Sequence, residues 1–190
     1  MIYNLTKFFR TKIKIDITKK QTKELFVDLL PKNERIIIDV VNSSEKVKWS
    51  CYNWYLGKNI SRIEVNPNYQ MYWTSFLKYS SHEAYPGHHT EFAIKEERLY
   101  CELNQFEHSI LILQSPKLVI SEGIANKAIS ILFSNYEVAE IGLNEFCSAP
   151  LKEVSIEELE LQDIVKAKIP LFWYNLAYHA LVDRYDEKEL

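Results

Sequence analysis

The stretch SSHEAYPGHHTEF, residues 80–92, decides how the whole chain is interpreted, because it crowds three histidines and two carboxylates around a proline and a glycine. A His-Glu pair followed by another histidine is typical of zinc peptidases, which place the second histidine four residues after the first. Here His82 and Glu83 form the pair, but Pro86 stands where the next histidine is expected. The stretch is therefore either a broken metal motif or a motif with a longer spacing.

The residues before the proline predict a helix over 70–84 whose apolar face carries a carboxylate. At about 100° per residue, Phe76, Ser80 and Glu83 share one face of this helix. His82 lies one step further around it. An ionised carboxylate on an apolar face is costly unless it has a partner, so Glu83 calls for a functional reason.

A bend after this helix selects the second histidine. Pro86 lacks an N–H donor and disfavours helical geometry in the residue before it, whereas Gly87 tolerates backbone angles that other residues avoid. The helix must bend before it resumes over 87–103. After the bend, His88 heads the apolar stripe and is expected to face the core, while His89 falls beside that stripe. We therefore choose His88 as the inward residue, with His89 as the alternative.

A later helix, predicted over 119–134, carries a second isolated carboxylate. Glu122 lies above Ile129 and away from the polar strip of that helix, so it needs a cation or a strong donor nearby. Catalytic zinc takes about three protein ligands and keeps one position open for water. His82, His88 and Glu122 supply such a set of ligands for one zinc ion.

Glu83 then lies next to a ligand without being one, and we expect it to take a proton from zinc-bound water as the catalytic base. This is the logic of the H-E-x-x-H peptidases with a longer segment between the histidines. The alternative is that the histidines are ordinary turn residues. In that case Glu122 is an acidic residue in the first turn of a helix, favoured there by the helix dipole.

Three further residues are weaker candidates. His108 is interpreted as an ordinary, partly exposed histidine. His179 is interpreted as a hydrogen-bonded core histidine, with contact to a substrate oxyanion as the alternative. Tyr178 has the same two interpretations.

Composition predicts one globular domain over residues 1–190, since 47% of the residues are hydrophobic and 26% are charged. A net charge of -3 gives no reason to expect nucleic acid as a partner. The most apolar late stretch, residues 169–182, is too short to span a membrane, and the N-terminus lacks a secretory signal, so we expect a cytoplasmic protein. The fold class is mainly α with a small β element (α+β). Strands are expected over 35–41 and 61–68, and helices over 19–30, 70–84, 87–103, 105–114, 119–134, 156–168 and 171–184.

The segments HEAYPGHH (82–89) and SEGIANKA (121–128) together resemble a largely uncharacterised bacterial family of zincin-like proteins. That family carries His-Glu-x-x-Pro-Gly-His-His and a later Glu-Gly-x-Ala helix. The resemblance is best over about 62–133. It implies a helical, gluzincin-type metallopeptidase domain, and the family's greater usual length implies that this chain is a shortened version of that architecture.

Carried over position by position, the resemblance implies zinc ligands at His82, His88 and Glu122 and a base at Glu83. It places His89 beside the ligands or the substrate. The leading hypothesis is a zinc-dependent hydrolase that cleaves peptides, with the strand at 61–68 pairing with an extended substrate. The alternatives are a non-catalytic metal-binding pseudoenzyme and a helical interaction module derived from a larger peptidase.

Overall fold

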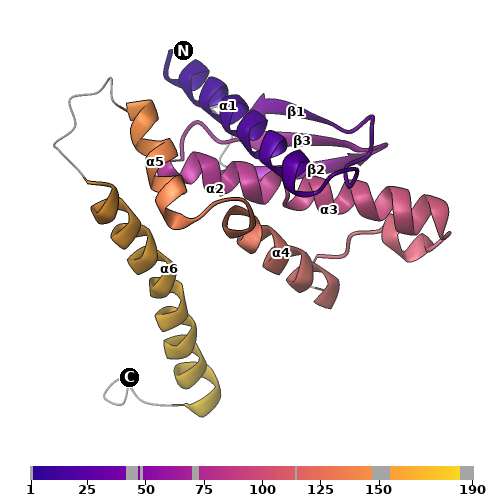
Figure 1. Ribbon diagram of the computed structural model, residues 1–190. Coiled ribbons are helices and arrows are strands. Elements are labelled where there is room, and N and C mark those ends of the chain that lie inside the picture. Colours follow the sequence, from indigo (N-terminus) through magenta and orange to yellow (C-terminus); the bar gives the residue numbers. More distant parts are fainter. Residues whose placement is uncertain are drawn as a thin grey trace. The chain divides into compact units, whose positions relative to one another are not determined.

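The computed structural model describes residues 2–41, 47, 49–69, 73–113, 115–146 and 155–184 (Figure 1). The chain divides into two compact units, Met1–Phe133 and Ser134–Leu190, which are taken here one at a time. Helices make up 63% of the structure and the sheet has three strands, so the predicted mainly helical α+β class is confirmed. Within the part of the chain that is described, no helix is both long and apolar enough to cross a membrane.

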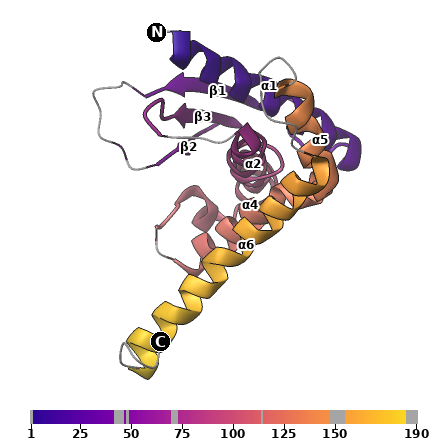
Figure 2. The ribbon, with the colours of Figure 1, turned by 90° about the vertical axis from the view of Figure 1, so that its left-hand side faces the viewer.

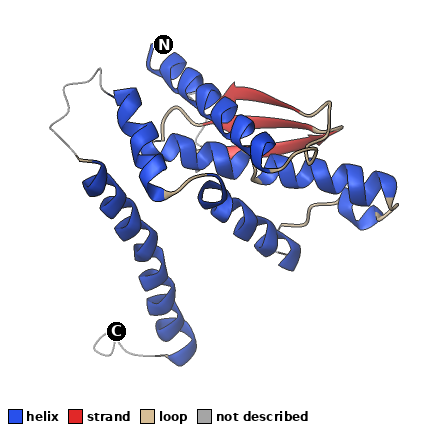
Figure 3. Cartoon of the chain, viewed as in Figure 1, coloured by secondary structure: helices blue, strands red, loops and turns tan. Residues whose placement is uncertain are grey.

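The first unit contains a small mixed sheet, shown in red in Figure 3. Its strands are β1 (Arg35–Val40), β2 (Cys51–Gly57) and β3 (Ile60–Val65), in the order β1-β3-β2. β3 is the central strand, parallel to β1 and antiparallel to β2. Its residues alternate between buried and half-buried, so one face of the sheet is packed more closely than the other.

Strand β2 was not predicted, because its aromatic residues do not alternate clearly with polar ones. It forms a hairpin with β3 through Lys58 and Asn59, both of which have positive φ. Two such residues are characteristic of a tight hairpin turn, and Gly57 before them also has a positive φ of 80°. The Gly-Lys-Asn run between two apolar segments is the signal that would have revealed this strand.

The helices of the first unit lie mainly on one side of the sheet (Figures 1 and 2). α2 packs against both α1 and α4. A buried cluster of Ile15, Ile63, Ala84 and Tyr85 joins α1, the central strand and the end of α2. The helical elements are α1 (Ile2–Leu25), α2 (Trp73–Glu83), α3 (His88–Ile94) with its π-helical continuation η1 (Lys95–Glu102), the short 3-10 turn η2 (Phe106–Ser109) and α4 (Pro116–Leu132).

Three helices of this unit differ from the predicted ranges. α1 runs from Ile2 to Leu25, whereas a helix was predicted over 19–30. α4 begins three residues earlier than predicted, because the Ser115 side chain accepts a hydrogen bond from the Leu118 N–H at 3.3 Å and Pro116 occupies the first helical position. The helix expected over 105–114 is only the short turn η2, and the chain is extended at Ile110.

The second unit consists of α5 (Asn135–Phe146), α6 (Ile156–Tyr178) and the short π-helix η3 (His179–Asp183). α5 was not predicted, although Ser134 and Glu137 form reciprocal cap hydrogen bonds that match the sequence pattern of a capping box. α6 starts at a capping box of Ser155 and Glu158 and continues past Pro170, so the predicted break at that proline is wrong.

Candidate metal centre

The His82–His89 segment consists of the end of α2, a tight turn and the start of α3. The Gly87 N–H donates to the Ser81 carbonyl at 2.9 Å, which closes the turn back onto α2. A Cβ atom on Gly87 would lie 1.9 Å from the His82 carbonyl oxygen, closer than any real contact. Only glycine fits this position, and the close approach brings the start of α3 back toward His82.

The turn places the two histidines side by side. The ring centroids of His82 and His88 are 4.8 Å apart with the ring planes nearly perpendicular. α4 packs against both α2 and α3 and brings Glu122 to the same place. Glu122 Oε2 lies 3.5 Å from His82 Nε2, and Glu122 Oε1 lies 3.3 Å from His88 Nε2.

These three residues fit a zinc ion. One ligand atom from each, two imidazole nitrogens and a carboxylate oxygen, can be chosen so that all lie within 4.8 Å of one another. Ligands at about 2.0–2.1 Å in a tetrahedron lie roughly 3.4 Å apart, close to the two His-to-Glu122 distances. The set predicted from sequence, His82, His88 and Glu122, is therefore brought together by the fold.

Burial prepares the two histidines to act as ligands. It lowers the pKa of His82, as does the neighbouring His88, while the charge of Glu122 opposes this. Burial likewise lowers the pKa of His88, again against the effect of Glu122. A histidine binds metal through a neutral ring, which these surroundings favour at neutral pH.

Glu122 itself differs from expectation. It was predicted on a buried apolar face, but its side chain is 46% exposed. The reason is that α4 presents Ala125, Ala128 and Leu132 to the core, and Glu122 lies at the margin of that buried stripe. The carboxylate reaches the histidines from the solvent side.

Glu83 lies on the buried face predicted for it and is 7% exposed. Its pKa is raised to about 8, first by burial and then by the negative charge of Glu122, against a hydrogen bond from the Asn53 backbone. Glu83 and His82 line the same cavity of about 250 Å³ between α2, α4 and the start of β2. A cation among the ligands would oppose both causes of the raised pKa, because its positive charge favours the carboxylate.

His89 is fully buried, so the expectation that it falls beside the inward-facing stripe is wrong. Its Nδ1 lies 2.8 Å from Ser61 Oγ on the central strand, and its Nε2 lies 3.1 Å from Glu34 Oε2. Lys19 pairs with the other Glu34 oxygen at 2.7 Å, and the Tyr85 hydroxyl donates to Glu34. After the turn, His88 and His89 both point inward, one toward α4 and the other toward the sheet.

The two remaining candidates belong to the second unit. Tyr178 is exposed, and His179 is half exposed with its Nδ1 2.7 Å from Asp183 Oδ2. Within the second unit, His179 therefore pairs with a neighbouring carboxylate on η3, and its interpretation as a core histidine stays a prediction. His108 is partly exposed, as expected, and lines the larger cavity of the first unit.

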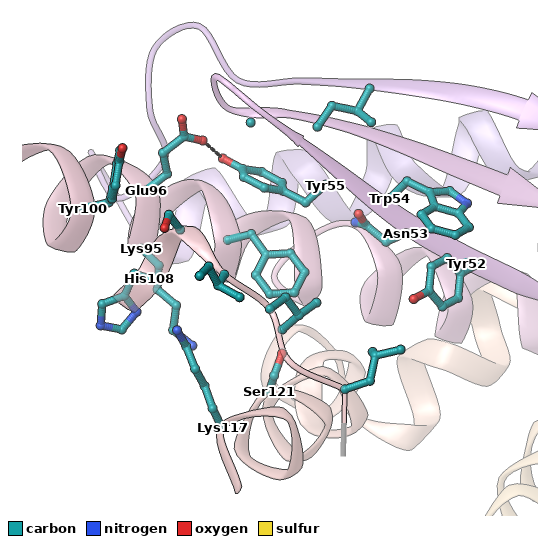
Figure 4. A pocket seen from close by; sticks show the side chains of 17 residues that line it. Tyr52, Asn53, Trp54, Tyr55, Lys95, Glu96, Tyr100, His108, Lys117 and Ser121 are labelled. Carbon is teal, nitrogen blue, oxygen red and sulfur yellow. Dashed lines mark hydrogen bonds between the residues drawn. The ribbon is translucent and has the colours of Figure 1, made fainter. Parts of the chain in front are cut away.

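That larger cavity, of about 570 Å³, runs along β2 (Figure 4). Consecutive residues from Tyr52 to Gly57 line it, and since neighbouring strand residues point to opposite faces, the cavity follows the edge of the strand. Tyr55 forms its β2 wall and Ser121 its α4 wall, one residue from Glu122. The predicted substrate strand at 61–68 is β3, which is paired on both sides. The sheet edge that borders this cavity is that of β2.

Sequence reasoning missed three residues around the cluster. Asn53 on β2 donates from Nδ2 to the Glu83 carbonyl at 2.5 Å, which ties the strand to the end of α2. Ser121 and Glu91 contact each other beside His88. Glu91 lies one turn after His88, which is a usable signal, but nothing in the sequence marks Asn53.

No family model, curated protein or solved structure matches this chain. The function of the site is therefore inferred from its own geometry.

Proposed function

We propose that the chain is a zinc-dependent hydrolase of the metallopeptidase type, with a zincin-like arrangement of its first unit. The observation that carries this proposal is the convergence of His82, His88 and Glu122. Glu83 follows His82 directly and lines a cavity together with it. Two neutral imidazoles and one carboxylate are a usual ligand set for catalytic zinc, which keeps a further position for water.

The roles of the residues follow from their positions. His82 Nε2, His88 Nε2 and the Glu122 carboxylate would hold the ion. When bound, zinc supplies a Lewis acid and makes water acidic enough to lose a proton near neutral pH. Glu83 accepts the proton of the attacking water and passes it to the leaving amine, since it is the carboxylate next to a ligand that is not itself part of the cluster.

The surroundings support an extended peptide as the substrate. The edge of β2 runs along the larger cavity, and an extended chain can add to such an edge through main-chain hydrogen bonds. Among the described residues, the buried Oδ1 of Asn53, which lines this cavity, has no hydrogen-bond partner. The aromatic and aliphatic lining of the cavity suits apolar side chains.

Metal content and a single substitution test the proposal. The purified protein should contain one zinc ion per chain by elemental analysis and cleave members of a fluorogenic peptide library. Glu83→Gln keeps the side-chain volume but removes the proton acceptor, so zinc should be retained while the rate falls by about 10²- to 10⁴-fold.

Other results would point elsewhere. Zinc binding without hydrolysis of any peptide would indicate a non-catalytic metal-binding module. Loss of zinc in Glu83→Gln would make Glu83 a ligand, and the absence of zinc from the wild type would overturn the proposal.

A further inference from the structure

The two ring nitrogens of His88 have different partners. Nε2 faces Glu122 Oε1 at 3.3 Å and belongs to the ligand cluster. Nδ1 lies on the other side of the ring, 3.3 Å from the hydroxyl oxygen of Ser121. A histidine that binds a metal through one nitrogen leaves the other for a hydrogen bond, and that bond decides which nitrogen carries the proton.

Ser121 is placed to make that decision. It is 1% exposed, and its hydroxyl donates to Glu91 Oε2 at 2.5 Å. A serine hydroxyl has one proton and two lone pairs, so once its proton is directed at Glu91 it can only accept from His88. The donor in the contact with Ser121 must then be the Nδ1–H of His88.

Glu91 is held in position for this contact. It is 8% exposed and lies one turn after His88 on α3, and its second oxygen forms an ion pair with Lys95 in the next turn. A carboxylate can only accept hydrogen bonds, so Glu91 forces the Ser121 proton away from the histidine. The series Lys95–Glu91–Ser121–His88 therefore has one consistent direction of donation.

We propose that Ser121 and Glu91 are positioning residues for the metal centre: they keep the proton of His88 on Nδ1 and so leave the Nε2 lone pair directed at the ion. This inference rests on the proposed metal centre. It adds a link between α3 and α4, because Ser121 directs His88 while its neighbour Glu122 provides another ligand. Hydrogen-bond partners of ligating histidines typically contribute about 10- to 100-fold to metal affinity.

Two substitutions and a matched control test this role through zinc affinity, measured by competition with a chromophoric chelator. Ser121→Ala removes the acceptor, and Glu91→Gln allows the serine proton to turn toward His88. Each should weaken zinc binding by about 10- to 100-fold at unchanged stoichiometry. Ser130→Ala, an exposed serine on the same helix that donates only to the Lys127 carbonyl, should leave the affinity unchanged.

The protonated nitrogen can be observed directly. In long-range ¹H–¹⁵N spectra of the metal-free Glu122→Ala chain at pH 8, which lacks the carboxylate that otherwise accepts a proton from Nε2, His88 should carry its proton on Nδ1. Adding Ser121→Ala should move that proton toward Nε2. This readout separates a positioning role from a loss of stability, which circular dichroism follows in parallel. The Glu122→Ala spectrum, with a substitution at a half-exposed side chain, serves as the test even where the Ser121 variant fails to fold.

Either of two results would overturn the positioning role of Ser121 and Glu91 while leaving the proposed metal centre intact. The first is a zinc affinity in folded Ser121→Ala within twofold of the wild type. The second is a His88 protonated on Nε2 in the metal-free Glu122→Ala chain. Failure of the wild type to bind any zinc would instead overturn the proposed metal centre, and this inference with it.

Discussion

Replacing Gly87 by alanine should separate the two histidines of the metal centre. The added Cβ would lie 1.9 Å from the His82 carbonyl oxygen, 2.4 Å from the Ser81 carbonyl oxygen and 2.6 Å from the His82 carbonyl carbon. All three obstructing atoms belong to the main chain, so no side chain can rotate away. To restore a contact of 3.0 Å, the turn must open by roughly 1 Å.

The cost follows from this geometry. Overpacking in a core typically costs about 1–3 kcal/mol when side chains can shift. A clash with the main chain should cost as much as the upper end of this range or more, because the main chain cannot rotate away. We expect Gly87→Ala to reduce the free energy of unfolding by about 3 kcal/mol or more. Metal ligands must be held within about 0.5 Å of their working geometry, so zinc affinity should fall as well.

Gly123→Ala is the matched control, because it makes the same chemical change on α4, beside Glu122. A Cβ there would have nothing within 4 Å. Alanine is the better helix former by about 0.5–1 kcal/mol, so this variant should be slightly more stable than the wild type and bind zinc normally.

Urea denaturation and chelator competition measure both quantities. The two substitutions should change the free energy of unfolding in opposite directions. A Gly87→Ala protein with wild-type stability and zinc affinity would show that the turn does not hold His82 against His88 as described.

Two further predictions concern the buried network around His89. His89→Ala removes one buried hydrogen-bond partner from Glu34 and one from Ser61, and it should destabilise the protein by about 3 kcal/mol in urea denaturation. The folded variant should still bind one zinc ion, because all three ligands remain. Loss of zinc in folded protein would instead place His89 among the ligands. Burial alone would raise the pKa of Glu34, but hydrogen bonds from His89, Lys19 and Tyr85 outweigh it and lower the pKa to about 2. Because the folded pKa of Glu34 lies below the unfolded one, this stabilisation is complete above about pH 5 and is lost as the pH falls toward 2. The difference in free energy of unfolding between the wild type and Glu34→Gln should therefore narrow by up to about 3 kcal/mol over that range. A difference that stays constant with pH would contradict the lowered pKa of Glu34.

Those parts of the fold and the site that depend on local chemistry could be predicted from the sequence. The alternation of Ile63 and Val65 with charged residues predicted the central strand, and the apolar spacing before the proline predicted a buried Glu83. The Pro-Gly pair predicted a bend. Each of these features follows from the periodicity of one helix or strand, or from the restricted backbone geometry of a single residue. None of them depends on which segments pack nearby.

The features that depend on which elements pack together could not be predicted from the sequence. Helical spacing placed His89 beside the core-facing stripe, but a tight turn followed by a new helix buries both neighbouring histidines, one against α4 and one against the sheet. Spacing also made Glu122 appear buried, whereas α4 contacts the core along an adjacent stripe and leaves it half exposed.

The strand edge and the hydrogen bonds that surround the metal centre could not be predicted from the sequence either. The free edge of β2 and the contact of Ser121 with His88 join residues far apart in the chain. A periodic pattern identifies the face of an element that will be buried, but it carries no information about the direction from which a distant segment approaches that face. That direction is set only when α2, α3 and α4 pack together, and it is what converts separate histidines and a carboxylate into one cluster.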